Sequence, residues 1–495
     1  MCDSAGVAES STQNRTSRPM KCDLYRFSRM VAFSLLLLMH VAQAQRDDTP
    51  LDVLSKALDT ELRSRALRNA LVGVEISDVR GGTILYSRNA DMLLRPASTT
   101  KLLTSAAALL RLPDNAGFTT RLRRTASGGT LICVGGGDPM FSMQDMEKLA
   151  DFARDSAIAR YDTLLLDPSV FDSTVFGEGW MWDDEADPFM PALSPFCLER
   201  NIARINVSKS TQRTGNIAVD FDPPSSILSW SRGGSSGETV IRKLPRGNHF
   251  VIHGAVPATP VRERFAIWDP RAVFADVLRT KLLQRGLVDS TVVLAIGGTE
   301  ATVVELGAIV RPLDEVLAEM NKQSDNLCAE MTLRLLGTSL PGGAASAKSG
   351  LEAMHAAFRD KGLPTGPLAL VDGSGISFYN LVGVGFLGKV LRLMAVQTQF
   401  ERYRSTLAVP GGEGTMRNRL QGEKRVAGVR MKTGTLRGVS TLAGYVQAPG
   451  GRLLAVVLFM QNFTGSHTPF REAQDRMVRH CLDYSASPQN TTRPR

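Results

Sequence analysis

The segment 98–112 constrains the fold of this chain most strongly, because it is apolar on nearly every side of a helix. A helix of this kind has to lie inside a core. Ser98 and Lys101 stand three residues apart at its head and share one face, although burying an ammonium group is costly. The segment is therefore either an ordinary helix with a serine cap and a solvent-facing lysine, or part of a buried reactive site.

Both ends of the chain predict strands. Residues 71–87 read as two strands around a turn at 80–82, and 441–461 read as a hairpin that turns at 449–451. Apolar spacing predicts amphipathic helices over 51–67 and 470–482. We therefore expect an α+β fold in which the two ends complete one antiparallel sheet.

The middle of the chain shows a different sequence pattern from the two ends. From 118 to 302, short strand-like pieces alternate with Gly and Pro clusters, and one clear helix covers 270–285. Helical patterns resume over 312–320 and 327–336. We expect a β-rich insertion over 118–302, which divides one domain into the parts 45–117 and 303–485. A polar tail, 486–495, is expected to be disordered.

The first 44 residues resemble a cleaved signal peptide. Arg26 and Arg29 precede an apolar run at 30–42, and the small residues Ala42 and Ala44 form a cleavage site. The run is too short to span a bilayer, although an uncleaved helix is the alternative and Met20 is a second candidate start. We expect an exported, periplasmic protein, and a peripheral membrane association stays open.

Charge and cysteine content narrow the function classes. Removing residues 1–44 would take away five basic and three acidic side chains and leave a formal net charge of +7. The chain shows no basic cluster interleaved with aromatic residues, so nucleic acid is not an expected partner. The cysteine and histidine spacing suggests no metal, and no cofactor is expected. Four cysteines are expected in the mature chain, either paired or as buried thiols: Cys133, Cys197, Cys328 and Cys481.

Three short motifs carry the chemistry. Ser98 and Lys101 form the first, Ser324-Asp-Asn326 lies between two predicted helices, and Lys432-Thr-Gly-Thr435 lies on a predicted strand. Each motif alone reads as a cap or a turn. In this order and in these settings, together they resemble the active-site triplet of serine β-lactamases and penicillin-binding proteins.

The spacing of the motifs narrows the resemblance. Ser98 and Ser324 are 226 residues apart, and the β-rich insertion fills this gap. The chain thereby resembles the class C low-molecular-mass penicillin-binding proteins, the D-alanyl-D-alanine carboxypeptidase/endopeptidase family. Further segments support this: "GGGDP" (135–139), "VDGSGIS" (371–377), "PGGEGTMRNRL" (410–420) and the residues around the three motifs.

The resemblance implies a transpeptidase-like catalytic domain interrupted by two β-rich domains. It implies action on D-Ala-D-Ala ends or D-Ala-diaminopimelate cross-links of peptidoglycan stem peptides, and acylation by β-lactam antibiotics. Ser98 would be the nucleophile, Lys101 its base and Ser324 a proton relay to the leaving amine.

The remaining motif residues would bind substrate. Asn326 would hold the substrate amide, and Lys432 would attract a terminal carboxylate with the hydroxyls of Thr433 and Thr435. Gly434 would let the substrate backbone lie close to the strand. The backbone N–H groups of Ser98 and Thr435 would form the oxyanion hole.

Two positions test substrate side-chain recognition. Asp184, in "GWMWDDEADPF", is the best match to an acidic residue that the family uses to meet a side-chain amine, although a surface Asp in an acidic loop fits equally well. The family usually carries an Arg where this chain has Phe378, and a phenyl ring cannot replace the paired hydrogen bonds of a guanidinium.

Other functions are consistent with parts of the pattern. A catalytically silent wall-binding scaffold would use the insertion alone. A β-lactamase or an esterase would use the same three motifs, but would turn over penicillin or hydrolyse a simple ester. Preference for carboxypeptidase or endopeptidase substrates stays open at this point, as do oligomeric state and the effect of Phe378.

Overall fold

The computed structural model describes residues 48–155, 160–212, 216–366 and 368–485. The chain divides into two compact units, Met1–Val53 and Leu54–Arg495, and the account below concerns the second. The signal peptide expected over 1–44 and the tail expected over 486–495 lie outside the described residues. Among the residues described, every helix is too short or too polar to span a membrane.

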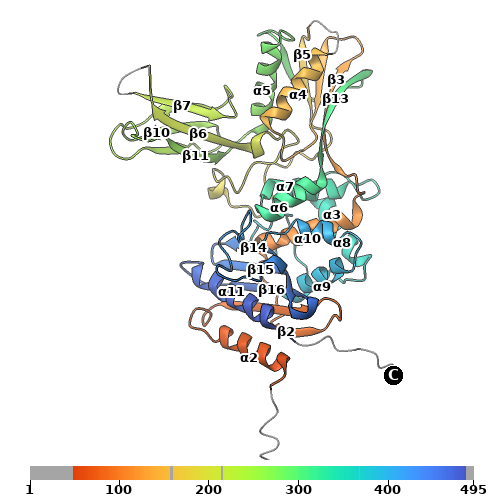
Figure 1. The fold of residues 1–495 in the computed structure, drawn as a ribbon. Coiled ribbons are helices and arrows are strands. Elements are labelled where there is room, and N and C mark those ends of the chain that lie inside the picture. The colour runs from red at the N-terminus through yellow and green to blue at the C-terminus, as the bar shows by residue number, and fades with distance from the viewer. Residues whose placement is uncertain (1–47, 156–159, 213–215, 367, 486–495) are drawn as a thin grey trace, which may run out of the picture. The chain divides into compact units, whose positions relative to one another are not determined.

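A five-stranded antiparallel sheet joins the two ends of the second unit (Figure 1). Strand β1 pairs along its whole length with β16, so the expectation that both ends complete one sheet is confirmed. The order across the sheet is β14 (Val429–Leu436), β15 (Val439–Ala448), β16 (Arg452–Gln461), β1 (Leu71–Asp78) and β2 (Ile84–Arg88). This order leaves β14 at one edge, with its outer side not covered by another strand of the sheet.

Helices cover both faces of this sheet. Alternate side chains of β15 divide between two cores: Ala443 and Tyr445 join one, whereas Leu442 and Val446 join the other. The second core includes α2 (Pro50–Leu62) from Leu54 onward and α11 (Thr468–Asp483). The first includes α3 (Thr100–Arg111), α6 (Leu313–Lys322), α7 (Asn326–Gly337), α8 (Ala347–Arg359), α9 (Val384–Ala395) and α10 (Phe400–Ser405).

Helix α3 confirms that the segment 98–112 is central. A short 3₁₀ turn, η1 (Ala97–Thr99), carries Ser98 and leads into α3, of which every residue from Thr100 to Leu109 is buried. Lys101 is fully buried, so the solvent-facing lysine is excluded. Helix α2 is shorter than expected, because it ends at Leu62 and a series of turns follows.

Between β3 and β13 the chain forms three further sheets. The largest has the order β12 (Val293–Ile296), β5 (Thr163–Asp167), β4 (Thr130–Val134), β3 (Gly117–Thr125) and β13 (Val303–Pro312). Strand β13 pairs with β3 as far as Pro312, so this sheet continues past the boundary expected at residue 302. The three-stranded sheets are β11-β6-β7 and β8-β10-β9. Their strands are β6 (Ile202–Lys209), β7 (Ile217–Asp222), β8 (Ser229–Arg232), β9 (Val240–Lys243), β10 (His249–His253) and β11 (Val261–Ala266).

The insertion holds one helix more than the sequence indicated. Helix α5 (Pro270–Gln284) was expected, but α4 (Met143–Arg154) was not. The sequence signal for α4 is the capping box of Ser142 and Asp145, in which each side chain accepts from the backbone N–H of the other residue. The amphipathic pattern alone did not reveal this helix. Side chains of all three sheets and both helices belong to one hydrophobic cluster.

All four described cysteines are free and buried. Of the two alternatives left open by the sequence, paired cysteines or buried thiols, the structure has the second. Burial raises the pKa of each thiol, so the reactive thiolate form is disfavoured.

Candidate active site

Ser98 and Lys101 lie in hydrogen-bond contact. The amine of Lys101 donates to Ser98 Oγ over 3.0 Å, to Asn326 Oδ1 over 2.6 Å and to the carbonyl of Ser374 over 2.7 Å. Ala97 precedes the serine with a φ of +47°, a left-handed conformation that non-glycine residues adopt rarely. Such strain is common where a side chain has to be presented for reaction.

The environment of Lys101 favours its neutral form. Burial is the largest influence and lowers its pKa to about 8, against the opposing charges of Asp372 and Glu330. A lysine with this pKa supplies an appreciable amount of free amine near neutral pH. The pair therefore has the geometry and the protonation equilibrium of an activated serine.

The second motif brings Ser324 and Asn326 to the same place. Ser324 has a φ of +66°, and Asp325 caps α7 by accepting from the N–H of Cys328 over 2.8 Å. Both ends of the Asn326 amide are occupied: Oδ1 accepts from Lys101, and Nδ2 donates to the carbonyl of Phe189 over 2.7 Å. Asn326 thus orients Lys101 in addition to any contact with substrate.

Lys432 completes the cluster from strand β14. Its amine donates to Ser324 Oγ and to the carbonyl of Thr433, each over 2.8 Å. Burial, followed by the charge of Lys101, holds the pKa of Lys432 well below its usual value. Each of the two fully buried lysines is thus hydrogen-bonded to one serine, Lys101 to Ser98 and Lys432 to Ser324.

Gly434 is required for a reason that the sequence did not reveal. A Cβ at this position would lie 2.1 Å from Thr441 Oγ1 and 2.9 Å from the backbone nitrogen of Ser98. The absent side chain therefore lets β14 approach the serine turn, in addition to any approach by substrate.

The structure separates Lys432 from the two threonines. Lys432 pairs with Ala443 and faces the core that holds Ser98, whereas Thr433 pairs with Leu442 and faces the α11 side. Thr435, two residues on, also faces that side and is exposed. The positive group beside the threonine hydroxyls is Arg471 of α11, whose Nη2 donates to Thr435 Oγ1 over 3.5 Å. Sequence reasoning missed Arg471.

Two buried acids, Glu330 and Asp372, also support the site. Sequence reasoning missed both. Glu330 Oε1 accepts from the backbone N–H groups of Gly373 (3.0 Å) and Ser374 (2.9 Å). Asp372 accepts from the N–H groups of Gly375 and Ser377, each over 2.8 Å. Together they fix the turn that offers the Ser374 carbonyl to Lys101. "VDGSGIS" was noted as a motif, but nothing in it indicated this contact.

The insertion contacts the site directly. Trp180 Nε1 donates to Asp372 over 3.2 Å, and Arg200 pairs with Asp325 over 2.7 Å. With the bond from Asn326 to Phe189, three residues of the insertion hold the loops that carry the second motif and the Ser374 carbonyl.

Comparison with known proteins agrees with this geometry. Residues 54–482 match the D-Ala-D-Ala carboxypeptidase 3 (S13) family. The chain belongs to this S13 family.

Relatives of this S13 family member cover most of its length. A D-alanyl-D-alanine carboxypeptidase of Actinomadura sp. (strain R39) is 29% identical over 451 residues, which is 83% of this chain and 82% of the relative. D-alanyl-D-alanine carboxypeptidase DacB of Haemophilus influenzae is 26% identical over 422 residues, 82% of this chain and 88% of the relative.

A solved structure shows the same fold. The crystal structure of penicillin binding protein 4 (dacB) from Haemophilus influenzae superposes with a TM-score of 0.76 at 23% identity, over 87% of this chain and 99% of that one. The expected α+β fold of the penicillin-binding class is thereby confirmed.

A guanidinium lies beside Phe378, although position 378 itself carries no arginine. The Arg95 guanidinium lies over the Phe378 ring, 5.3 Å from its centre, and Arg95 Nε donates to the Phe378 carbonyl over 3.4 Å. A cation in this position is attracted by the ring face. In this S13 family member, the charge expected at 378 is thus found on the side chain just before the serine turn.

No hydrogen bond or ion pair joins the Asp184 side chain to the three motifs within the described residues. It is exposed, in the 3₁₀ turn η2 (Trp182–Asp184), and its carboxylate makes no ion pair within the described part of the chain. Partial burial and the charges of Asp183 and Asp187 raise its pKa. The same loop continues to Phe189, whose carbonyl contacts Asn326.

Proposed function

We propose that this protein is a serine DD-carboxypeptidase/DD-endopeptidase that cleaves D-Ala-D-Ala ends or D-Ala-diaminopimelate cross-links of peptidoglycan. The observation that carries the proposal is the contact between Ser98 Oγ and the fully buried amine of Lys101, whose pKa is lowered to about 8. The family to which the chain belongs supports the same reaction.

The reaction proceeds through an acyl-enzyme. Neutral Lys101 takes the proton of Ser98 as Oγ attacks the D-Ala carbonyl, and the N–H groups of Ser98 and Thr435 stabilise the oxyanion. The amide C–N bond then breaks, and Ser324 passes a proton to the leaving amine, replaced from Lys432. Water then attacks the ester and gives up a proton that returns through Ser324 to Lys432, while Lys101 returns its proton to Ser98 Oγ as the ester C–O bond breaks.

Substrate is held on both sides of the scissile bond. The hydroxyls of Thr433 and Thr435 bind the carboxylate of the leaving residue, with Arg471 as the positive group beside Thr435. Gly434 and Asn326 line the acyl side, where Asn326 contacts the substrate amide. Asp184, on the exposed loop, meets a side-chain amine of the stem peptide.

The site also fits β-lactams as covalent inhibitors. A structure of penicillin binding protein 4 (dacB) from Haemophilus influenzae is described as a complex with a novel β-lactam, with a TM-score of 0.70 to this chain. Export to the periplasm, expected from residues 1–44, would bring the enzyme to its substrate. We propose that the catalytic domain is interrupted after residue 117 and resumes after 312, because β13 pairs with β3 up to that point.

Intact mass after brief exposure to benzylpenicillin tests this function. We expect one lasting adduct on the wild type and none on Ser98→Ala. Rapid consumption of penicillin without an adduct would identify a β-lactamase instead. Intact penicillin without an adduct would contradict the acyl-enzyme and favour a silent scaffold. Release of D-Ala from a pentapeptide then separates the peptidase from an esterase.

A further inference from the structure

We infer that an arginine-lined pocket beyond Thr435 binds the carboxylates of the peptide strand released when a cross-link is cut. The inference rests on the proposed function and deepens it, because it assigns a binding site to the leaving group. It predicts that a cross-linked peptide is a better substrate than a peptide that loses a single D-Ala.

The pocket begins at the edge strand and ends at the last helix. Its volume is about 720 Å³, within the range of roughly 300–1,000 Å³ that is typical of ligand sites. Thr433, Gly434 and Thr435 form one wall, the loop 414–421 a second, and α11 a third. A single alanine would leave most of this space empty.

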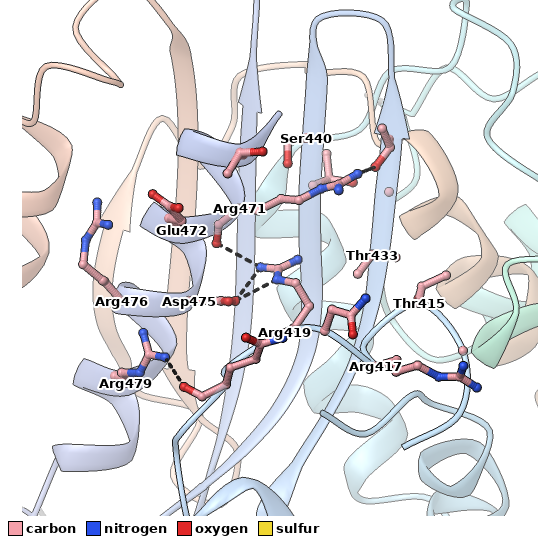
Figure 2. A pocket seen from close by; sticks show the side chains of 17 residues that line it. Thr415, Arg417, Arg419, Thr433, Ser440, Arg471, Glu472, Asp475, Arg476 and Arg479 are labelled. Carbon is pink, nitrogen blue, oxygen red and sulfur yellow. Dashed lines mark hydrogen bonds and ion pairs between the residues drawn. The ribbon is translucent and has the colours of Figure 1, made fainter. Parts of the chain in front are cut away.

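The lining is strongly basic. Five arginines and two carboxylates face the pocket: Arg417, Arg419, Arg471, Arg476, Arg479, Glu472 and Asp475. The Asp475 carboxylate is neutralised by an ion pair with Arg419, in which the nitrogen and oxygen lie 2.7 Å apart. Figure 2 shows Arg471 reaching from α11 toward the edge strand, and Arg417 across the pocket from Arg479.

Two of these arginines are available for a ligand. Arg417 is exposed, and its guanidinium makes no hydrogen bond or ion pair within the described residues. Arg471 is exposed, and its guanidinium makes one contact there, the long bond to Thr435. By contrast, Arg476 pairs with Glu61 over 2.8 Å, and Arg479 donates to the Gln421 carbonyl over 3.2 Å.

The direction in which the substrate peptide runs along β14 places the leaving group in this pocket. The hydroxyls of Thr433 and Thr435 hold the carboxylate of the leaving residue, and these side chains face α11 rather than Ser98. Anything attached to that residue therefore continues from the threonines into the pocket that they border.

The positive charge of the pocket favours the diaminopimelate strand over D-Ala as the leaving group. D-Ala has one carboxylate, and the threonines already bind it. The diaminopimelate strand carries further carboxylates, for which Arg417 and Arg471 provide donors. The occupant is thus an acidic peptide, the second strand of the cross-link.

The test compares two substrates in one set of variants. Arg417→Glu and Arg417→Gln are made in the full mature chain, with Arg242→Glu as the matched control, because Arg242 is exposed on β9 and does not line the pocket. The kcat/KM is measured for a D-Ala-diaminopimelate cross-linked muropeptide dimer and for a pentapeptide ending in D-Ala-D-Ala. We expect Arg417→Glu to lower the dimer-to-pentapeptide ratio about tenfold, and Arg417→Gln less. Arg242→Glu should leave the ratio unchanged.

A binding measurement makes the result independent of turnover. Calorimetry with the released diaminopimelate tetrapeptide should show a Kd about tenfold weaker for Arg417→Glu, and weaker binding at higher salt. An unchanged ratio together with an unchanged Kd would overturn the pocket assignment. If the wild type forms no penicillin adduct, the proposed function fails, and tetrapeptide binding still decides the pocket. Adduct formation by each variant reports that it is folded.

Discussion

The amine of Lys101 lies 3.0 Å from Ser98 Oγ and is held there by two further acceptors, Asn326 Oδ1 and the Ser374 carbonyl. Lys101→Met keeps the length of the side chain and removes the base. We expect acylation by benzylpenicillin to slow by about 10²- to 10⁴-fold, the usual range for a general base. The rate of adduct formation by mass spectrometry measures this, with thermal unfolding as the control for folding. A rate near that of the wild type would assign the base to another group.

The acylation rate should depend on pH through Lys101. Only the neutral amine accepts a proton, and its pKa is lowered to about 8. The rate should therefore rise about tenfold per pH unit below 8 and level off above it. Stopped-flow acylation from pH 5.5 to 9.5 measures the profile. A limb that continues to rise toward the ordinary lysine value of about 10.4 would contradict the lowered pKa.

Glu330 should act on the rate without touching substrate. Glu330→Ala leaves two buried N–H groups without an acceptor, and we expect a loss of about 1–3 kcal/mol in the free energy of unfolding. Glu330→Gln keeps an acceptor oxygen but removes the charge that the carboxylate carries above its own pKa, which burial raises to about 7, and that charge raises the pKa of Lys101. The rising limb of the pH profile should then move to lower pH. An unmoved limb in Glu330→Gln would show that Lys101 does not sense this carboxylate.

Gly434→Ala should separate β14 from Ser98. The new Cβ would overlap Thr441 Oγ1 and press on the Ser98 nitrogen, so the strand has to shift. We expect a loss of about 1–3 kcal/mol in stability and a fall of about a hundredfold in acylation rate. Gly298→Ala is the control, because a Cβ there has no atom within 4 Å. Equal rates for both variants would refute the packing role of Gly434.

Asp184→Asn tests the side-chain contact. The residue is exposed, so the loss of an ion pair with a substrate amine should lower kcat/KM by only about two- to fivefold. The effect should vanish when the amine is acetylated, and penicillin acylation should not change. A similar loss on the acetylated peptide would indicate a structural role for the loop.

Periodic segments could be predicted from the sequence. The apolar pattern gave α3, α5 and α11, and alternation with turn residues gave the hairpin of β15 and β16. The motif serines and lysines were found because their spacing along the chain is itself the signal. The structure joins Ser98 to Lys101 and Ser324 to Lys432 by hydrogen bonds, and Lys101 also donates to Asn326 of the second motif.

The supporting residues could not be predicted, because their contacts link distant positions. Glu330 meets the Ser374 backbone, and Arg471 meets Thr435, through pairings that no local pattern encodes. The parallel pairing of β5 with β4 and β12 was missed for the same reason, since register between remote strands depends on the tertiary core.

The pairing of β1 with β16 determines when the catalytic centre can exist. Ser98 follows the first strand, whereas Lys432 and the strands that complete the sheet come near the end of the chain. During synthesis, Ser98 emerges long before Lys432, and loop closure over hundreds of residues has to come before the two can lie in one site. The hydrogen bond between Ser324 and Lys432 can therefore form only after the last strands have docked onto the sheet.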